Sequence, residues 1–212
     1  MNRWRTALLP DVAVPAPTTG VYLGRNKSGP LTMRLFRPRG TRIAVFSGPL
    51  AAQLIALRAA QSGATVRVMS TREAAWGPVL RFGADARLLP PTGPSQMSAS
   101  GPQLLVDDRP DISRPFAEVP GWQCMLDVRV LGSDAAKQVD ENRVASFGNA
   151  DVAFFSVLGQ SMAAAVGNVF DLREAAASLT VVPPHAVAVV TRGSVQLVRL
   201  EPTGDERSAL RG

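Results

Sequence analysis

Apolar residues in the first third of the chain change their spacing twice, which predicts a strand, a helix and a second strand. Residues 42–47 form a short run rich in β-branched side chains, and Gly48 interrupts it. Between residues 50 and 61 the larger apolar side chains recur at helical spacing among alanines, and Gly63 supplies a stop. A second apolar run covers residues 65–69. Strand, tight turn, helix and strand within about 30 residues form the pattern of a parallel crossover.

The rest of the chain is divided by proline and glycine into further short elements. Two β-hairpins with Gly-containing turns are predicted, at residues 20–36 and 186–200. A helix at 72–82 is expected to break or kink at Gly77 and Pro78. Further strands are expected at 87–89, 103–108, 122–131 and 151–158, and further helices at 133–145, at 159–169 and from 171 onward.

This pattern indicates one α/β domain with a mainly parallel sheet of the RecA-like or P-loop-like type, flanked by helices. The domain is predicted to cover residues 20–202 and to carry a β-hairpin at each end. Residues 1–19 are rich in proline and threonine, and we expect them to be a flexible lead-in. Residues 203–212 are expected to form a flexible tail.

The turn after the first parallel strand lacks the chemistry of a phosphate-binding loop. A P-loop has the form G-x-x-x-x-G-K-[ST], and its lysine and hydroxyl contact the phosphates and Mg²⁺. Counting from Gly48 places Gln53, Leu54 and Ile55 at the second glycine, the lysine and the hydroxyl. Pro49 also removes an N–H group that would face a phosphate. We therefore interpret Ser47, Gly48 and Pro49 as a vestigial nucleotide site.

A dinucleotide site of the Rossmann type is the alternative interpretation of the same turn. The fingerprint G-x-G-x-x-G would fall on Phe46, Gly48 and Ala51, so that its first glycine is missing. An arginine, Arg72, follows the second strand, where it could contact a 2′-phosphate. Strand order distinguishes the alternatives, because a Rossmann sheet places the strand at 65–69 directly beside the strand that precedes Gly48.

Two carboxylates end the apolar strand at residues 103–108. A strand ending in Asp107 and Asp108 has the form of a Walker B element, in which the first acid holds Mg²⁺ through water and the second activates the attacking water. Because no P-loop is present to place the metal, we expect the two side chains to cap the following loop instead. No catalytic residue and no metal site are predicted.

Composition narrows the remaining classes of function. The chain has a net charge of +6, but its arginines are dispersed, so we predict a solvated surface and no sequence-specific nucleic-acid binding. An acidic partner surface or a membrane face remains open. No apolar run approaches the roughly 18 residues of a membrane span. The single cysteine, Cys124, is expected to be a buried thiol, and the single histidine, His185, a turn residue, which leaves no ligand set for zinc.

Taken together, residues 20–202 resemble the ATPase domain of the FtsK/SpoIIIE family. Within that family the chain is similar to the domains of the membrane ATPase of actinobacterial type VII (ESX) secretion systems. The P-loop strand and helix would be residues 43–60, and the closing helix, proline turn and hairpin would be residues 172–200. The resemblance places Asp107 at the metal-water position and Asp108 at the catalytic acid.

The resemblance, combined with the altered turn, implies a catalytically inactive, pseudo-ATPase-like domain without a cofactor. The secretion ATPases contain degenerate domains that serve as binding or regulatory modules. We therefore expect an interaction or scaffold component of a type VII secretion system, whose partner is a secretion ATPase or a second copy. The helix at 49–61, Asp107, Asp108 and the loop at 90–102 would lie near the interface. The expected location is cytoplasmic, with peripheral association at the inner face of the membrane left open.

Overall fold

A computed structural model gives the structure of the chain and describes residues 20–83, 85–92, 97, 101–109, 118–129 and 148–211. The expected lead-in at 1–19 and helix at 133–145 lie outside these residues, as do parts of the loops at 90–102 and 111–121. Within the described part, ten strands form one sheet in the order β2-β1-β10-β9-β8-β3-β7-β6-β4-β5. The strands are β1 (Val21–Asn26), β2 (Gly29–Met33), β3 (Thr41–Phe46), β4 (Thr65–Ser70), β5 (Ala86–Leu89), β6 (Gln103–Asp108), β7 (Gln123–Val128), β8 (Val152–Phe155), β9 (Ala186–Thr191) and β10 (Ser194–Leu200).

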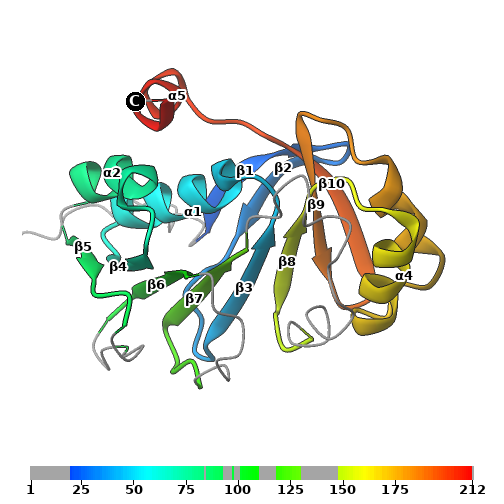
Figure 1. Ribbon diagram of the computed structural model, residues 1–212, viewed down its shortest axis with the longest axis horizontal. Helices are drawn as coiled ribbons and strands as arrows, with labels where there is room; N and C mark the ends of the chain where they lie inside the picture. Colours follow the sequence, from blue (N-terminus) through cyan, green and yellow to red (C-terminus); the bar gives the residue numbers. More distant parts are fainter. Residues whose placement is uncertain are drawn as a thin grey trace, which may run out of the picture.

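The sheet has a parallel half and an antiparallel half, which meet at β8. Strands β8, β3, β7, β6, β4 and β5 are parallel, and β9, β10, β1 and β2 continue the sheet as antiparallel pairs. The predicted α/β class, with a mainly parallel sheet and a β-hairpin near each end of the chain, is confirmed (Figure 1). The two hairpins also pair with each other through β1 and β10, which register Gly24 opposite Leu200.

The strand order separates the two interpretations of the turn at Gly48. Strand β3 lies between β8 and β7, and both β7 and β6 lie between β3 and β4. A Rossmann sheet would place β4 directly beside β3. The order observed here therefore differs from that of a Rossmann sheet and fits the P-loop-like interpretation.

In the described part of the chain, two helical layers cover the sheet, and a further helix lies outside them. Helices α1 (Pro49–Gln61) and α2 (Glu73–Phe82) contribute to one apolar cluster with Ile43 and Val45 of β3. Helix α4 (Gln160–Val169) and the 3₁₀ segment η2 (Arg173–Val181) contribute to a second cluster with Ala44 and Phe46. Because alternate residues of a strand face opposite sides, the two layers cover opposite faces of the sheet. A final helix, α5 (Gly204–Arg211), lies beyond α1 (Figure 1).

Helix α1 is buried on nearly all sides. It begins with Pro49 directly after Gly48. At the first position of a helix the backbone N–H has no partner within the helix, so a proline there removes no hydrogen bond. Its alanines allow close packing on the sheet below and on α2 beside it, and nine of its residues are buried. It ends at Gln61, where Gly63 adopts φ +87° and the Ala64 N–H donates to the Ala59 carbonyl. The predicted helix and its glycine stop are confirmed.

Three predicted elements differ from the structure. Helix α2 is not broken at Gly77 and Pro78: it runs from Glu73 to Phe82, with a buried Pro78 inside it. The strand predicted at 151–158 is shorter, since β8 ends at Phe155 and residues 156–159 connect it to α4. Residues 204–211 form helix α5, where we predicted a flexible tail.

Helix α5 is held by its own capping residues and by one buried ion pair. The Thr203 Oγ1 accepts a hydrogen bond from the Glu206 N–H, and the Glu206 carboxylate accepts one from the Thr203 N–H. The same carboxylate accepts hydrogen bonds from the Arg58 guanidinium of α1 at 2.7 Å and 2.6 Å. The segment is therefore held both by its local capping box and by a partner 148 residues away, and the local sequence gives no sign of that partner.

Candidate functional site at the carboxyl edge of the parallel strands

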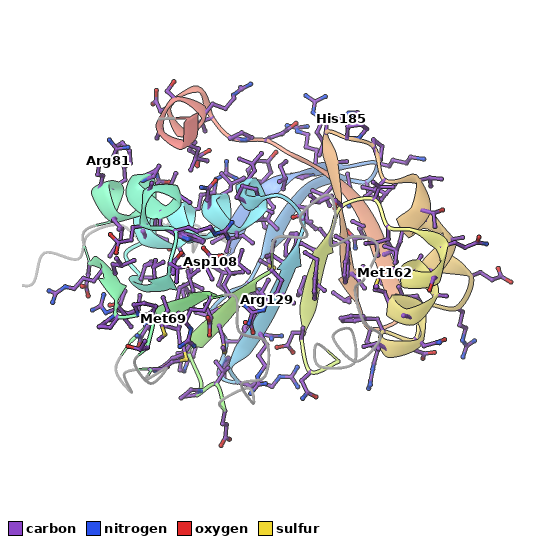
Figure 2. The ribbon with its side chains drawn as sticks, viewed as in Figure 1. Met69, Arg81, Asp108, Arg129, Met162 and His185 are labelled. Atoms are coloured by element: carbon purple, nitrogen blue, oxygen red, sulfur yellow. The ribbon has the colours of Figure 1, made fainter. Side chains whose placement is uncertain are left out.

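All of the predicted site residues come together at one edge of the sheet. Parallel strands present their carboxyl ends at the same edge, and α/β sheets bind ligands in the crevice outside those ends. Here β3 leads to Ser47, β6 ends at Asp108, β4 ends at Ser70, and β7 leads to Arg129. Figure 2 shows Asp108 and Arg129 in the central part of the molecule.

The turn between β3 and α1 is too short to be a P-loop. Strand β3 ends at Phe46 and α1 begins at Pro49, so Ser47 and Gly48 form the whole connection. A P-loop needs four residues between its two glycines to wrap a phosphate with N–H groups. Because the helix starts so early, Gln53 is already inside it, and its Nε2 donates to the Ala75 carbonyl of α2 at 2.6 Å.

Asp107 is paired with an arginine two residues later. The Arg109 Nε donates to Asp107 Oδ1 at 2.8 Å, and Arg109 Nη2 lies 2.5 Å from Oδ2. Both side chains are buried, with exposed fractions of 6% for Asp107 and 4% for Arg109. The Arg109 N–H also lies 3.3 Å from Asp107 Oδ1, so the carboxylate binds the start of the following loop, as the sequence predicted. The Arg109 guanidinium therefore already binds both oxygens of the Asp107 carboxylate.

Asp108 connects three elements on the opposite face of the sheet. Its Oδ2 accepts hydrogen bonds from Ser70 Oγ of β4 at 2.7 Å and from Trp76 Nε1 of α2 at 2.8 Å. Its Oδ1 is paired with the Arg72 guanidinium. The sequence predicted a loop cap at this position, but the structure shows a buried carboxylate that attaches α2 to the sheet.

A third carboxylate, Asp127 of β7, belongs to the same edge and was missed in the sequence. The parallel register places Asp127 directly beside Asp107, and Arg129 Nη2 donates to Asp127 Oδ1 at 2.9 Å. The pKa of Asp127 is raised to about 6, mainly by burial and in part by the nearby Asp107, whereas Arg129, Arg42 and Arg109 act to lower it. A repeated Asp-x-Arg spacing, at 107–109 and 127–129, is the sequence signal that could have indicated the pair.

Arg129 also closes the edge between the two strands. Its Nη1 donates to the carbonyls of Asp107 at 3.3 Å, Arg109 at 3.0 Å and Val128 at 3.1 Å. Asp107, Arg109, Asp127 and Arg129 thus form a buried cluster of alternating charge, which we call the arginine-filled edge. Within the described residues, no group of three or more His, Cys, Asp or Glu side chains could hold a metal ion. The two guanidinium groups supply the positive charge that the carboxylates require.

The residues of the alternative interpretation are also engaged in the fold. Arg72, the candidate for a 2′-phosphate contact, is paired with Asp108 while remaining about half exposed. Of the other residues singled out in the sequence, Cys124 is buried, and burial raises the pKa of its thiol. His185 is exposed in the turn before β9. Neither residue lies among the charged groups of the arginine-filled edge.

A groove between α4 and η2 is a further feature that the sequence did not indicate. Its volume is about 350 Å³, and its lining residues are small or neutral: Gln160, Ala163, Ala164, Ala176, Ala177 and Thr180. The two segments are so close at one point that a Cβ atom on Gly167 would lie only 2.7 Å from the Cβ of Ala176. Alanine side chains on both sides leave the space between the backbones unfilled.

Comparisons with known proteins find a similar fold but no family or curated protein that matches in sequence. No family model matches the chain, and no curated protein matches it. Among solved structures it is similar to VirB4 of Thermoanaerobacter pseudethanolicus, with a TM-score of 0.58 and 8% identity over 89% of this chain and 98% of that one. VirB4 is a P-loop ATPase of type IV secretion. In the described residues, none of the helices is long and apolar enough to cross a membrane. The chain therefore has a fold like that of a secretion-system ATPase.

Proposed function

We propose that this chain is a catalytically inactive relative of the secretion ATPases that acts through contacts with other proteins. One observation carries the proposal. Both carboxylates at the Walker B position are already engaged, Asp107 by Arg109 and Asp108 by Ser70, Arg72 and Trp76. A nucleotide-bound Mg²⁺ would need these oxygen atoms or the waters next to them.

Releasing Asp107 for such a role would be costly. Separating a buried ion pair leaves an uncompensated charge, which typically destabilises a protein by about 3–5 kcal/mol. The turn at Ser47 and Gly48 offers no compensation, because it has neither the lysine nor the wrapped N–H groups that bind phosphates. The chemistry at this edge therefore favours a closed, ligand-free arrangement over a nucleotide site.

We propose further that the apparatus is a type VII secretion system of the actinobacterial kind. The resemblance of residues 20–202 to FtsK/SpoIIIE domains supports this choice, and the VirB4-like fold supports a secretion-related role more generally. The partner in this proposal is a secretion ATPase or a second copy of the chain. The domain would then work at the cytoplasmic face of a membrane, through contact with membrane-bound components.

Calorimetric titration of the full chain with Mg-ATP, Mg-ADP and NADPH tests the loss of nucleotide chemistry. We expect no heat beyond dilution with any of the three ligands. Binding of Mg-ATP that is lost in Asp107→Asn would contradict the proposal, because it would mean that the carboxylate is available to a metal. Binding of NADPH that is lost in Arg72→Gln would instead support the dinucleotide alternative.

A further inference from the structure

An exposed aromatic side chain projects from one end of the molecule. Phe82 is the last residue of α2 and is 56% exposed. It continues the apolar spacing of Trp76 and Val79, which are buried, but the helix ends here and leaves the third side chain without a contact surface. Its neighbour Arg81 is also exposed and lies at the outer end of the α2 layer (Figure 2). Exposed aromatic side chains beside arginine are typical anchors of protein interfaces.

The α4–η2 groove lies at the other end of the molecule and offers an unfilled apolar surface. Two exposed valines are close in sequence to its lining residues: Val181 follows Thr180 and is 67% exposed, and Val157 precedes Gln160 by three residues and is 57% exposed. The hydrogen bond from the Leu158 N–H to the Leu179 carbonyl, at 2.9 Å, places these two valines on neighbouring segments. The groove and its valines form an apolar patch of the kind that marks an interaction site.

The two surfaces differ in place and in shape. Helix α2 contacts β5, which ends the sheet, whereas α4 and η2 cover β8, β9 and β10 on the opposite face. Figure 2 shows Arg81 and Met162 of α4 at opposite ends of the view. Because Phe82 and the groove lie at opposite ends, in layers on opposite faces of the sheet, one twofold contact would not place both side chains in both grooves. The two surfaces therefore fit a head-to-tail, heterologous contact between copies.

Charge around the two surfaces is complementary. Arg81 is next to Phe82, and Glu174 is an exposed residue two positions before Ala176 of the groove. Across the described residues, neither Arg81 nor Glu174 takes part in an ion pair. The other cation of this turn, Arg173, lies 3.9 Å from Asp171, which balances its charge. An exposed charge without an ion pair therefore lies beside each surface, positive beside Phe82 and negative beside the groove.

We propose that Phe82 of one copy inserts into the α4–η2 groove of a second copy, where Arg81 pairs with Glu174. The small residues that line the groove leave room for an aromatic ring, and the contact would cover Val157 and Val181 as well. In each pair one copy keeps its groove free and the other keeps its Phe82 free, so association continues until the chain of copies closes or is capped. The inference does not depend on the absence of nucleotide binding, because neither surface includes the arginine-filled edge.

Sedimentation velocity of the full chain over a concentration series provides the first test. The average mass should rise above that of a monomer with concentration. Phe82→Ser removes the inserting side chain, and Ala177→Trp fills the groove from an exposed position, so each should weaken association at least tenfold. Trp122→Ala is the matched control, because Trp122 is 54% exposed but lies before β7, away from both surfaces.

A mixing experiment tests the head-to-tail arrangement directly. The Phe82→Ser variant retains an intact groove, and the Ala177→Trp variant retains an intact Phe82. Each should be monomeric alone, and together they should form a one-to-one dimer that grows no further. Arg81→Glu and Glu174→Arg should each weaken association when introduced alone, and both together in one chain should restore it. Circular dichroism of each variant checks that the fold is kept.

Several results would overturn the inference. One is a wild-type chain that stays monomeric at the highest concentration reached. Another is association that Phe82→Ser leaves unchanged, which would mean that copies meet through other surfaces. A third is a control variant, Trp122→Ala, in which association is weakened as much as in Phe82→Ser. A fourth is failure of the two complementary variants to form a dimer when mixed. Nucleotide titrations of the same variants test the proposed function independently, because none of the substituted residues belongs to the arginine-filled edge.

Discussion

Asp107 and Asp127 are direct neighbours on the parallel strands β6 and β7, and each is paired with an arginine two residues further along the chain. Two buried carboxylates side by side would repel each other, and the arginines make the arrangement possible. Burial, and to a smaller extent repulsion from Asp107, raises the pKa of Asp127 to about 6.

The raised pKa predicts a particular dependence of stability on pH. Because Asp127 binds its proton more tightly in the folded protein than in the unfolded chain, its contribution is fully present below pH 4 and is lost as the pH rises through about 6. We expect the free energy of unfolding to fall by about 2–3 kcal/mol across this window, at about 1.4 kcal/mol per pKa unit. Urea unfolding at several values between pH 4 and pH 8 measures it. Asp127→Asn should remove this slope, and equal slopes in the two proteins would contradict the assignment.

Removal of the Asp108 carboxylate should destabilise the fold. Asp108→Ala leaves Ser70 Oγ and Trp76 Nε1 without their acceptor and separates α2 from β6, so we expect a loss of about 2–4 kcal/mol. Denaturant unfolding monitored by tryptophan fluorescence measures it, since Trp76 is one of the reporters. Arg72→Gln, which alters a half-exposed partner, should cost less. An Asp108→Ala variant as stable as the wild type would exclude the structural role.

The ion pair between Arg58 and Glu206 should hold the end of the chain in place. Glu206→Ala leaves the Arg58 guanidinium without its counter-ion and removes the cap of α5, so a loss of about 3 kcal/mol or more is expected. The neighbouring Asp205→Ala, at an exposed position, should change stability by less than about 0.5 kcal/mol. Hydrogen exchange should show faster exchange throughout α5 in Glu206→Ala alone. Similar exchange in both variants would mean that α5 is held by other contacts.

Substitution of Gly48 tests the turn at the vestigial site, and substitution of the closely packed Gly40 serves as the comparison. A Cβ atom on Gly48 would meet nothing within 4 Å, and the backbone φ there is −55°, so Gly48→Ala should leave stability unchanged within about 0.5 kcal/mol. A Cβ atom on Gly40 would lie 2.0 Å from the Val119 carbonyl oxygen, so Gly40→Ala should be strongly destabilising. Thermal unfolding of both variants measures the difference. A large loss in Gly48→Ala would indicate that this turn is more constrained than its geometry implies.

The parts of the fold that were predicted correctly depend on local signals. The run at residues 42–47, the alanine-rich helix that follows and the stop at Gly63 each follow from spacing and backbone preference. Helix α5 was missed although Thr203 and Glu206 form a local capping box, and its ion pair with Arg58, far away in sequence, leaves no local signal. The site was predicted in part: Asp107 and Asp108 were identified, but Asp127 was missed, because only the strand register brings it beside Asp107.

The sequence by itself determined the α/β class, the βαβ unit and the missing phosphate chemistry. These follow from hydrophobic periodicity and from residue types at fixed offsets, such as Pro49 where a phosphate loop would need N–H groups. Only the tertiary structure decided the strand order, the partners of the carboxylates and the location of the α4–η2 groove. Each of these depends on which distant segments pack side by side, and free energies of packing between segments leave no local pattern in the chain.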